Sequence, residues 1–441
     1  MSVTPNTPPE TSHTRTSDMT REVDSSDWLQ ALLQKPLLAT LETFRIGRLK
    51  IEMPDGSIQN FGTTTADGPL AEIIVHNHAF FRKCVLYGNV GLGESYMDGD
   101  WDTPDIGSVI EWFIFNLHAD KSAKGSSQKF RVLGLLRILD RIRHRLRHNS
   151  KTLSRRNIEE HYDLGNDFYR LWLDPSMTYS SAKFSHAEQT LESAQSEKYD
   201  ALCRKLQLNS SDHVLEIGCG WGGFALHAAR KYGCRVTGLT ISQAQHDEAS
   251  KRVKNAQLED RIKIRMEDYR DINGRFDKIV SIEMLEAVGD KFLETWCAKC
   301  NEILAPEGLL GIQMITVPDC DYDALRRGAD WIQKHIFPGS LLLSIDRMNL
   351  AMKRTGNLFL HNLEDLGSSY SRTLGEWHSS FNENLDAVRA LGFSERFLRK
   401  WNYYLKYCQA AFASRNISVV QGVYTRPANA STLTHEFGLN F

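Results

Sequence analysis

The hydrophobic pattern of the chain differs between its N-terminal and C-terminal parts. In residues 37–118, short runs of alternating apolar and polar residues, such as GRLKIEM (47–53) and AEIIVHN (71–77), are separated by Gly-containing turns. This alternation is typical of half-buried strands and predicts a small α+β domain. Residues 1–36 are rich in Ser, Thr, Pro and Asp and carry few large apolar side chains, so we predict a disordered tail there.

Strand-like and helix-like segments alternate in residues 157–441. The runs predicted to be strands are HVLEIG (213–218), CRVTGLTI (234–241), IKIRME (262–267), FDKIVSIE (276–283) and GLLGIQMITV (308–317). Because helix-like stretches separate them, the pattern predicts an α/β fold with a doubly wound, mostly parallel sheet. In such a sheet a ligand binds at the carboxyl ends of the strands, so we expect the site at that edge.

The segment between these regions, residues 119–156, is predicted to be a basic amphipathic helical linker. Residues 121–156 carry a formal charge of +11, so the remainder carries −13 because the whole chain carries −2. Apolar residues recur there at three- and four-residue spacing, and Arg137, Arg141 and Arg145 recur at every fourth residue. Two interpretations stay open: attachment to an anionic lipid surface, or an interdomain helix with a solvated charged face. Nucleic acid is disfavoured as a partner, because no nucleic-acid-binding module is recognised and the remainder is acidic.

The composition narrows the class of protein. With 441 residues, 41% of them hydrophobic and 24% charged, the chain is expected to be a globular protein of two domains. No apolar run approaches the roughly 18 to 20 residues that span a bilayer, and no secretory signal is recognised, so a cytoplasmic location is expected. The eight cysteines are scattered, which indicates a reducing compartment. Cys297 and Cys300 form a C-x-x-C that we interpret as a buried helix pair, and no metal site is predicted.

The stretch VLEIGCGWGGFA (214–225) predicts a nucleotide site, because a strand, a glycine turn and a helix start bring free backbone N–H groups together. Dinucleotide enzymes carry an acid about 20 residues further on, but here that place holds uncharged residues. The pattern therefore favours adenosine without a pyrophosphate, and S-adenosylmethionine over NAD or FAD. The residues expected to bind this cofactor are Glu216, Gly218, Cys219, Gly220, Thr240, Ile241, Ser242, Gln245, Asp268 and Tyr269.

Several motifs together resemble the cyclopropane fatty acid synthase family. They are GLGESYMDGDWD (91–102), HYDLGNDFY (161–169), MTYSSAKF (177–184), GLTISQAQ (238–245), DYRD (268–271), FDKIVSIEMLEAVG (276–289) and HIFPG (335–339), in the family's order. The resemblance implies that S-adenosylmethionine methylates a cis double bond in an acyl chain of a membrane phospholipid. A base then removes a proton from the new methyl group of the carbocation, and a cyclopropane ring closes. The resemblance also adds Tyr179 and Ser180 to the expected cofactor site.

The family usually holds bicarbonate as that base, and the resemblance implies a matching pocket. Glu286 and Tyr370 match the family's Glu and Tyr, and the backbone of Ile315 matches a further position. Ser181 and Gln313 stand where many members have Cys and His, which places the chain in a branch with YSSA and EAVG motifs. Both side chains can donate hydrogen bonds to an anion, so bicarbonate is expected as a possible bound base.

The same resemblance leaves other products and partners open. The alternatives are a methylene- or methyl-branched fatty acid, N-methylation of a small amine, and a non-catalytic lipid-binding protein. Aromatic side chains expected to line the path of the cation are Tyr179, Tyr370 and either Trp331 or Phe337, whereas His161 and Cys408 are interpreted as structural. The expected partners are an unsaturated phospholipid and an anionic membrane surface, at the inner face of the membrane, with a homodimer left open.

Overall fold

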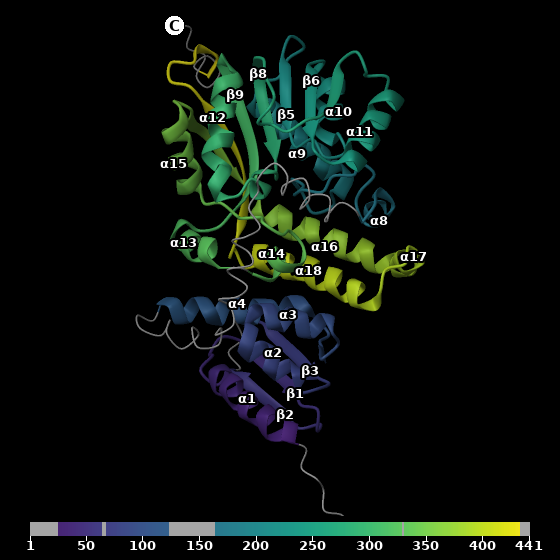
Figure 1. The fold of residues 1–441 in the computed structure, drawn as a ribbon, viewed down its shortest axis with the longest axis vertical. Helices are drawn as coiled ribbons and strands as arrows, with labels where there is room; N and C mark the ends of the chain where they lie inside the picture. The colour runs from purple at the N-terminus through teal and green to yellow at the C-terminus, as the bar shows by residue number, and fades with distance from the viewer. Residues whose placement is uncertain (1–24, 64–67, 123–163, 329, 433–441) are drawn as a thin grey trace, which may run out of the picture.

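The computed structural model describes residues 25–63, 68–122, 164–328 and 330–432, and in them two units are stacked along the long axis of the molecule (Figure 1). The N-terminal unit is drawn in purple and blue, and the larger unit runs from teal to yellow. This arrangement confirms the predicted fold class, an α/β domain with a smaller α+β domain ahead of it.

The N-terminal unit is a four-stranded sheet covered by helices. Its elements are α1 (Ser25–Leu41), β1 (Arg48–Glu52), β2 (Ile58–Gly62), β3 (Leu70–Val75), α2 (Ala79–Tyr87), α3 (Asn89–Met97), β4 (Trp101–Asp102) and α4 (Ile106–Ser122). The strand order is β2-β1-β3-β4, with β1 parallel to β3 and antiparallel to β2. The two alternating runs of the sequence are β1 and β3, in which every second side chain is buried.

The boundary predicted at residue 37 falls inside α1, so residues 25–36 are helical rather than part of a disordered tail. The helix is held by its last turns, because Leu37 and Leu41 are buried in the core of the unit. The first part of this helix, SSDWLQALLQKP, holds four large apolar side chains, so it differs from the composition of residues 1–36 as a whole. Residues 1–24 lie outside the described part of the chain.

The larger unit is built on a seven-stranded sheet in the described residues, with the order β10-β11-β9-β8-β5-β6-β7. Its strands are β5 (His213–Ile217), β6 (Arg235–Thr240), β7 (Ile262–Met266), β8 (Phe276–Ile282), β9 (Leu304–Thr316), β10 (Phe359–Asp365) and β11 (Ser418–Thr425). Only β11 runs against the others, because it pairs antiparallel with both β9 and β10. The five predicted strands are confirmed as β5 to β9, and β10 and β11 are additions that the pattern did not predict.

Helices cover both faces of this sheet and form a further layer beneath its carboxyl edge (Figure 1). They are α8 (Asn166–Arg170), α9 (Leu191–Lys205), α10 (Gly223–Tyr232), α11 (Gln243–Asn255), η1 (Leu285–Ala287), η2 (Asp290–Phe292), α12 (Leu293–Ile303), α13 (Asp319–Arg327), α14 (Trp331–His335), α15 (Ile345–Thr355), α16 (Gly367–Glu383), α17 (Leu385–Ala390), α18 (Glu395–Ala413) and η3 (Ala430–Thr432). Helices α13, α14, α16 and α18 lie between the sheet and the N-terminal unit.

The two units share one hydrophobic cluster, which runs from the N-terminal sheet through α3 and α4 into α16 and α18. Close approach at this junction depends on Gly93 of α3, because a Cβ there would lie 2.5 Å from the Trp331 ring and 2.8 Å from the Tyr403 ring. Polar contacts surround it: Glu94 accepts from Lys334 and His335, at 2.8 and 2.9 Å. The GLGESYMDGDWD motif thus docks the N-terminal unit onto the layer beneath the sheet.

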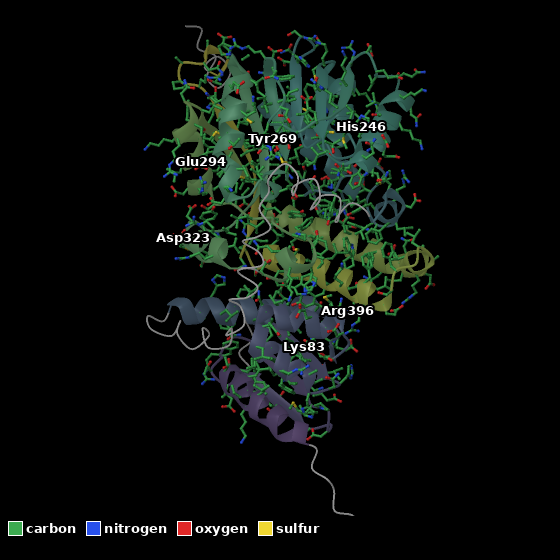
Figure 2. The ribbon with its side chains drawn as sticks, in the orientation of Figure 1. Lys83, His246, Tyr269, Glu294, Asp323 and Arg396 are labelled. Atoms are coloured by element: carbon green, nitrogen blue, oxygen red, sulfur yellow. The ribbon has the colours of Figure 1, made fainter. Side chains whose placement is uncertain are left out.

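Figure 2 labels two cations that meet near this junction, Lys83 of α2 and Arg396 of α18. Each lies 2.7 Å from a carboxylate oxygen of Asp98. Arg399, one turn further along α18, donates to the backbone oxygen of Trp101 at 2.8 Å and pairs with Asp102 at 2.8 Å. The motif's acidic residues therefore anchor α18, which in turn forms one wall of the cavity described next.

Candidate active site

A cavity of about 720 Å³ lies between the carboxyl edge of the sheet and the helical layer beneath it. Its wall includes the turns after β5 and β6, the ends of β8 and β9, and residues of α13, α14, α16 and α18. The N-terminal unit contributes Asn89, at the start of α3. A volume of this size suits a small-molecule ligand, and its position is the one that the strand pattern predicted.

The glycine turn after β5 brings backbone to the cavity surface. Gly218 and Gly220 have φ of +84° and +51°, in the left-handed region that favours glycine. A Cβ on Gly218 would lie 2.6 Å from Cγ of Met284, whereas a Cβ on Gly220 would meet nothing within 4 Å. The backbone at Gly220 and Cys219 is therefore open to a ligand in the cavity.

Glu216 stands just ahead of this turn and also lines the cavity. Its side chain is buried, and its Oε2 atom has no hydrogen-bond partner in the described structure. Burial raises the pKa of this carboxyl well above its ordinary value. A buried carboxylate oxygen without a partner is costly, so this atom indicates a ligand that carries a donor or a positive charge.

The remaining residues predicted to bind the cofactor lie on the same side of the cavity, with one exception. Thr240, Ile241, Gln245, Asp268 and Tyr269 line it, and Thr240 donates to Oε1 of Gln245 at 2.8 Å. The exception is Ser242.

Ser242 is not among the residues that line the cavity, and its hydroxyl caps helix α11 by accepting from the N–H of Gln245. Tyr269, labelled in Figure 2, follows the end of β7 and is next to Asp268 in the sequence. Both oxygens of Asp268 accept from Arg270, at 2.8 and 2.6 Å. The orientation of this carboxylate at the cavity wall is thereby fixed.

Tyr179 and Ser180 also line the cavity. The Tyr179 hydroxyl is 2.8 Å from that of Tyr404, and the Ser180 hydroxyl accepts from the ammonium of Lys198 at 2.6 Å. Lys198 is fully buried, and burial lowers its pKa to about 8 although Glu283, Asp174 and Glu216 oppose the shift.

Glu286, in η1, projects its carboxyl group into the cavity. Its Oε1 atom accepts from the N–H of Ile315 at 2.6 Å, and its Oε2 atom is buried without a hydrogen-bond partner among the described residues. Burial, and then the charge of Glu283, raise its pKa to about 8. A carboxyl group in this state exchanges a proton near neutral pH, which suits acid–base chemistry.

Glu283 lies three residues before Glu286, at the end of β8, and holds the centre of the predicted anion pocket. Its Oε1 atom accepts from the N–H of Ser181 at 2.8 Å and from Nε2 of Gln313 at 2.7 Å. Its Oε2 atom accepts from the hydroxyl of Tyr370 at 2.8 Å. Gln313 and Tyr370 thus bind Glu283 with the side-chain groups that were expected to bind bicarbonate, whereas Ser181 binds it with its backbone N–H and its hydroxyl donates to the backbone oxygen of Ala182.

Glu283 was not among the predicted site residues, and two others are placed differently from the prediction. Ser181 and Gln313 do not line the cavity, because they lie behind Glu283 and hold it. A signal for this was present: a second glutamate in SIEMLEAVG accompanies an uncharged Gln where a His was expected. An amide that replaces a cation can still satisfy a carboxylate, which is the pairing that the structure shows.

The orientation of the Gln313 amide is set by a chain of hydrogen bonds through β11. Nε2 of Gln421 donates to Oε1 of Gln313 at 3.0 Å, and Oε1 of Gln421 accepts from Lys205 at 2.6 Å. Because the ammonium of Lys205 only donates, the amide of Gln421 has one orientation, and the amide of Gln313 follows from it. The Gln313 NH2 group is therefore directed toward Glu283.

Beyond the two glutamates the cavity is apolar and aromatic. Its lining here includes Ile315, Leu342, Phe337, Leu374, Tyr404, Cys408, Phe412 and Ile417. Of the two aromatic candidates, Phe337 lines the cavity, whereas Trp331 is buried at the junction against Tyr403. An apolar chain would find a complementary surface in this part.

Other predicted features lie elsewhere or outside the described residues. Cys297 and Cys300 are buried in α12, and no group of side chains in the described residues could hold a metal ion. His161 and the basic segment around Arg137 lie outside the described part of the chain. None of the helices that the structure describes is long and apolar enough to cross a membrane.

Comparisons with known proteins identify the family. The model of the family described as mycolic acid cyclopropane synthetase matches residues 149–422, more than half of the chain. Tuberculostearic acid methyltransferase UfaA1 of Mycobacterium tuberculosis is 33% identical over 92% of this chain and 96% of its own length. Cyclopropane-fatty-acyl-phospholipid synthase of Escherichia coli is 36% identical over 81% of this chain and 88% of its own.

A solved structure adds the cofactor. The mycolic acid cyclopropane synthase CmaA1, complexed with SAH and CTAB, superposes with a TM-score of 0.58 at 28% identity. The superposition covers 62% of this chain and 98% of that one.

Proposed function

Because this chain belongs to the mycolic acid cyclopropane synthetase family and is an S-adenosylmethionine-dependent methyltransferase, we propose that it methylates the double bond of an unsaturated phospholipid acyl chain and closes a cyclopropane ring. The observation that carries the proposal is one cavity with two unlike halves. A polar half at the glycine turn adjoins an apolar half, and the two glutamates lie between them.

We assign the polar half to the cofactor. The residues present fit S-adenosylmethionine, because the unpartnered oxygen of Glu216 suits a cationic ligand and the backbone at Gly220 is open. Thr240, Gln245 and Asp268 supply acceptors for hydroxyl and amine groups. When bound, the cofactor supplies an electrophilic methyl group on a sulfonium centre.

The apolar half would hold the acyl chain and shield the reaction. A carbocation next to the new methyl group is trapped by water, so the wall must exclude water and offer negative charge. Tyr179, Tyr404 and Phe337 form an aromatic wall there, and the carboxylate of Glu283 provides the negative charge. The protein thus stabilises the cation and keeps a base beside it.

The test is mass spectrometry of lipids from a bacterium that lacks its own synthase, after expression of this chain with trideuteromethyl-labelled methionine. We expect acyl chains heavier by one methylene unit that have lost one of the three deuteriums, with fragmentation diagnostic of a ring. Retention of all three would show that no proton leaves the transferred methyl, and would refute ring closure.

A methylene-branched product, formed when the same cation loses a different proton, is the second candidate, because a relative that matches 92% of this chain is named a tuberculostearic acid methyltransferase rather than a synthase. The same spectra separate the two products. Absence of labelled lipid, in cells where the purified protein binds S-adenosylmethionine, would instead favour a small acceptor such as an amine.

We further propose that the enzyme acts at an anionic membrane surface. The support is the sequence of residues 121–156 alone, with its charge of +11. Replacing Arg137, Arg141 and Arg145 with Gln should reduce sedimentation with anionic vesicles, most clearly at low salt. Unchanged sedimentation would show that the segment is a linker. A homodimer stays a prediction that analytical ultracentrifugation checks.

A further inference from the structure

We propose that Glu283 is the base that removes the proton from the transferred methyl group, so that a side chain of this protein replaces bicarbonate. The inference rests on the proposed function and concerns its last step. It is carried by the three donors that surround the Glu283 carboxylate and by the place of that carboxylate in the cavity wall.

The carboxylate of Glu283 occupies the hydrogen-bond donors of the anion pocket. A carboxylate and bicarbonate present the same planar O–C–O group, and the N–H of Ser181, the amide of Gln313 and the hydroxyl of Tyr370 all reach Glu283. The remaining expected donor, the N–H of Ile315, reaches Glu286. Bicarbonate would have to displace one of these carboxyl groups or lie beside both, so the residues present do not fit it.

The backbone supports the same assignment. Glu283 has φ of +47°, which is unfavourable for a residue with a side chain. Such strain persists where the surroundings hold the residue on several sides, and it is common at functional sites. Here the N–H of Glu283 also donates to the backbone oxygen of Gln313 at 2.7 Å, so backbone and side chain are both held by β9.

The two glutamates differ in what they can do. Three donors stabilise the ionised form of Glu283, whereas one donor reaches Glu286 and its second oxygen has none. Two neighbouring carboxyl groups do not both ionise readily, so the one that accepts more hydrogen bonds carries the charge. Glu283 is therefore the anion and Glu286 the group that keeps a proton near neutral pH.

Methyl transfer precedes ring closure. The π electrons of the double bond form a bond to the sulfonium methyl carbon, the S–C bond breaks, and its electron pair stays on sulfur. The neighbouring chain carbon becomes the cation. An oxygen of Glu283 then takes a proton from the new methyl group, and the released C–H electron pair closes the ring. Neutral Glu283 later returns the proton to solvent.

The first experiment measures the purified full-length enzyme on vesicles of unsaturated phospholipid, in buffer freed of carbon dioxide and then with added bicarbonate. We expect wild-type turnover to be the same in both buffers. A rate that falls on depletion and recovers with bicarbonate would overturn the inference, and this arm requires no variant.

The second experiment uses two variants of Glu283 and one control. Glu283→Gln keeps the shape and removes the base, so turnover should fall by about 10²- to 10⁴-fold. Glu283→Gly opens the pocket and leaves its donors in place, so bicarbonate should restore part of its turnover. Glu302→Gln, on the exposed side of α12, is the control and should match wild type.

Calorimetry of cofactor binding distinguishes a failure of the inference about Glu283 from a failure of the proposed function. Near-normal turnover of Glu283→Gln would overturn the inference, and so would a bicarbonate-dependent wild type, while both leave the proposed function standing. Wild type that binds S-adenosylmethionine and yields no labelled lipid in either buffer would refute the proposed function, and the inference with it.

Discussion

Replacing Glu286 with Gln should change the pH dependence of stability. Burial and the charge of Glu283 raise the pKa of Glu286 from its ordinary 4.5 to about 8 in the folded protein. Between these two values the folded state keeps a proton that the unfolded state has lost. The stabilising effect of this proton is complete below pH 4.5 and is lost as the pH rises toward 8.

The size of the effect follows from the two pKa values. A difference in pKa corresponds to about 1.4 kcal/mol for each pH unit, so wild type loses up to about 5 kcal/mol from this group across the window. Glu286→Gln carries no proton to lose, and its amide oxygen can still accept from the N–H of Ile315. Its stability relative to wild type should therefore increase as the pH rises.

The assay is urea unfolding of both proteins without cofactor, followed by circular dichroism at pH 5, 6, 7 and 8. We expect the difference in unfolding free energy between variant and wild type to change by several kcal/mol in favour of the variant. Glu302→Gln, at an exposed position, should show no such trend. A difference that is equal at pH 5 and pH 8 would refute the assignment of Glu286 as a protonated buried group.

Three further changes test the rest of the site. Gly93→Ala should destabilise the junction by about 1–3 kcal/mol, because its Cβ would lie 2.5 Å from the ring of Trp331, and limited proteolysis should then release the N-terminal unit. Gln421→Met leaves the Gln313 oxygen unpaired, so it should lower the free energy of unfolding in urea by about 1–3 kcal/mol. It should also lower turnover without weakening cofactor binding, and unchanged turnover would contradict this positioning role. Gly218→Ala should weaken cofactor binding about tenfold in calorimetry, because its left-handed φ of +84° disfavours alanine; equal affinity would argue against the turn as the cofactor site.

Much of this architecture could be predicted from periodicity. The strands β5, β8 and β9 stand out because parallel strands in the middle of a sheet are buried on both faces and mostly apolar, whereas the edge strand β7 stands out by its alternation of apolar and exposed basic residues. Strand β10 was not predicted, because as an edge strand most of its side chains are exposed. The residues of the glycine turn could also be predicted, because the strand, the glycines and the helix start are contiguous in the sequence at 214–225.

The anion pocket could not be predicted in the same way, because its parts come from four separate segments. Ser181, Glu283, Gln313 and Tyr370 meet only after the sheet and α16 are assembled. Position-by-position matching assigned Ser181 and Gln313 to an external anion, since each can donate a hydrogen bond. That both bind Glu283 depends on the end of β8 and on the register of β9 with β11, which no local pattern encodes.

The left-handed backbone of Glu283 has an evolutionary consequence. Glycine is the residue that adopts this conformation with the least strain, and glutamate and glycine codons differ by a single nucleotide. One base change would relieve the backbone and empty an anion-sized space that keeps its donors. A protein that uses the Glu283 side chain as the base and one that binds bicarbonate in its place would thus differ by a single substitution, and the rest of the fold need not change.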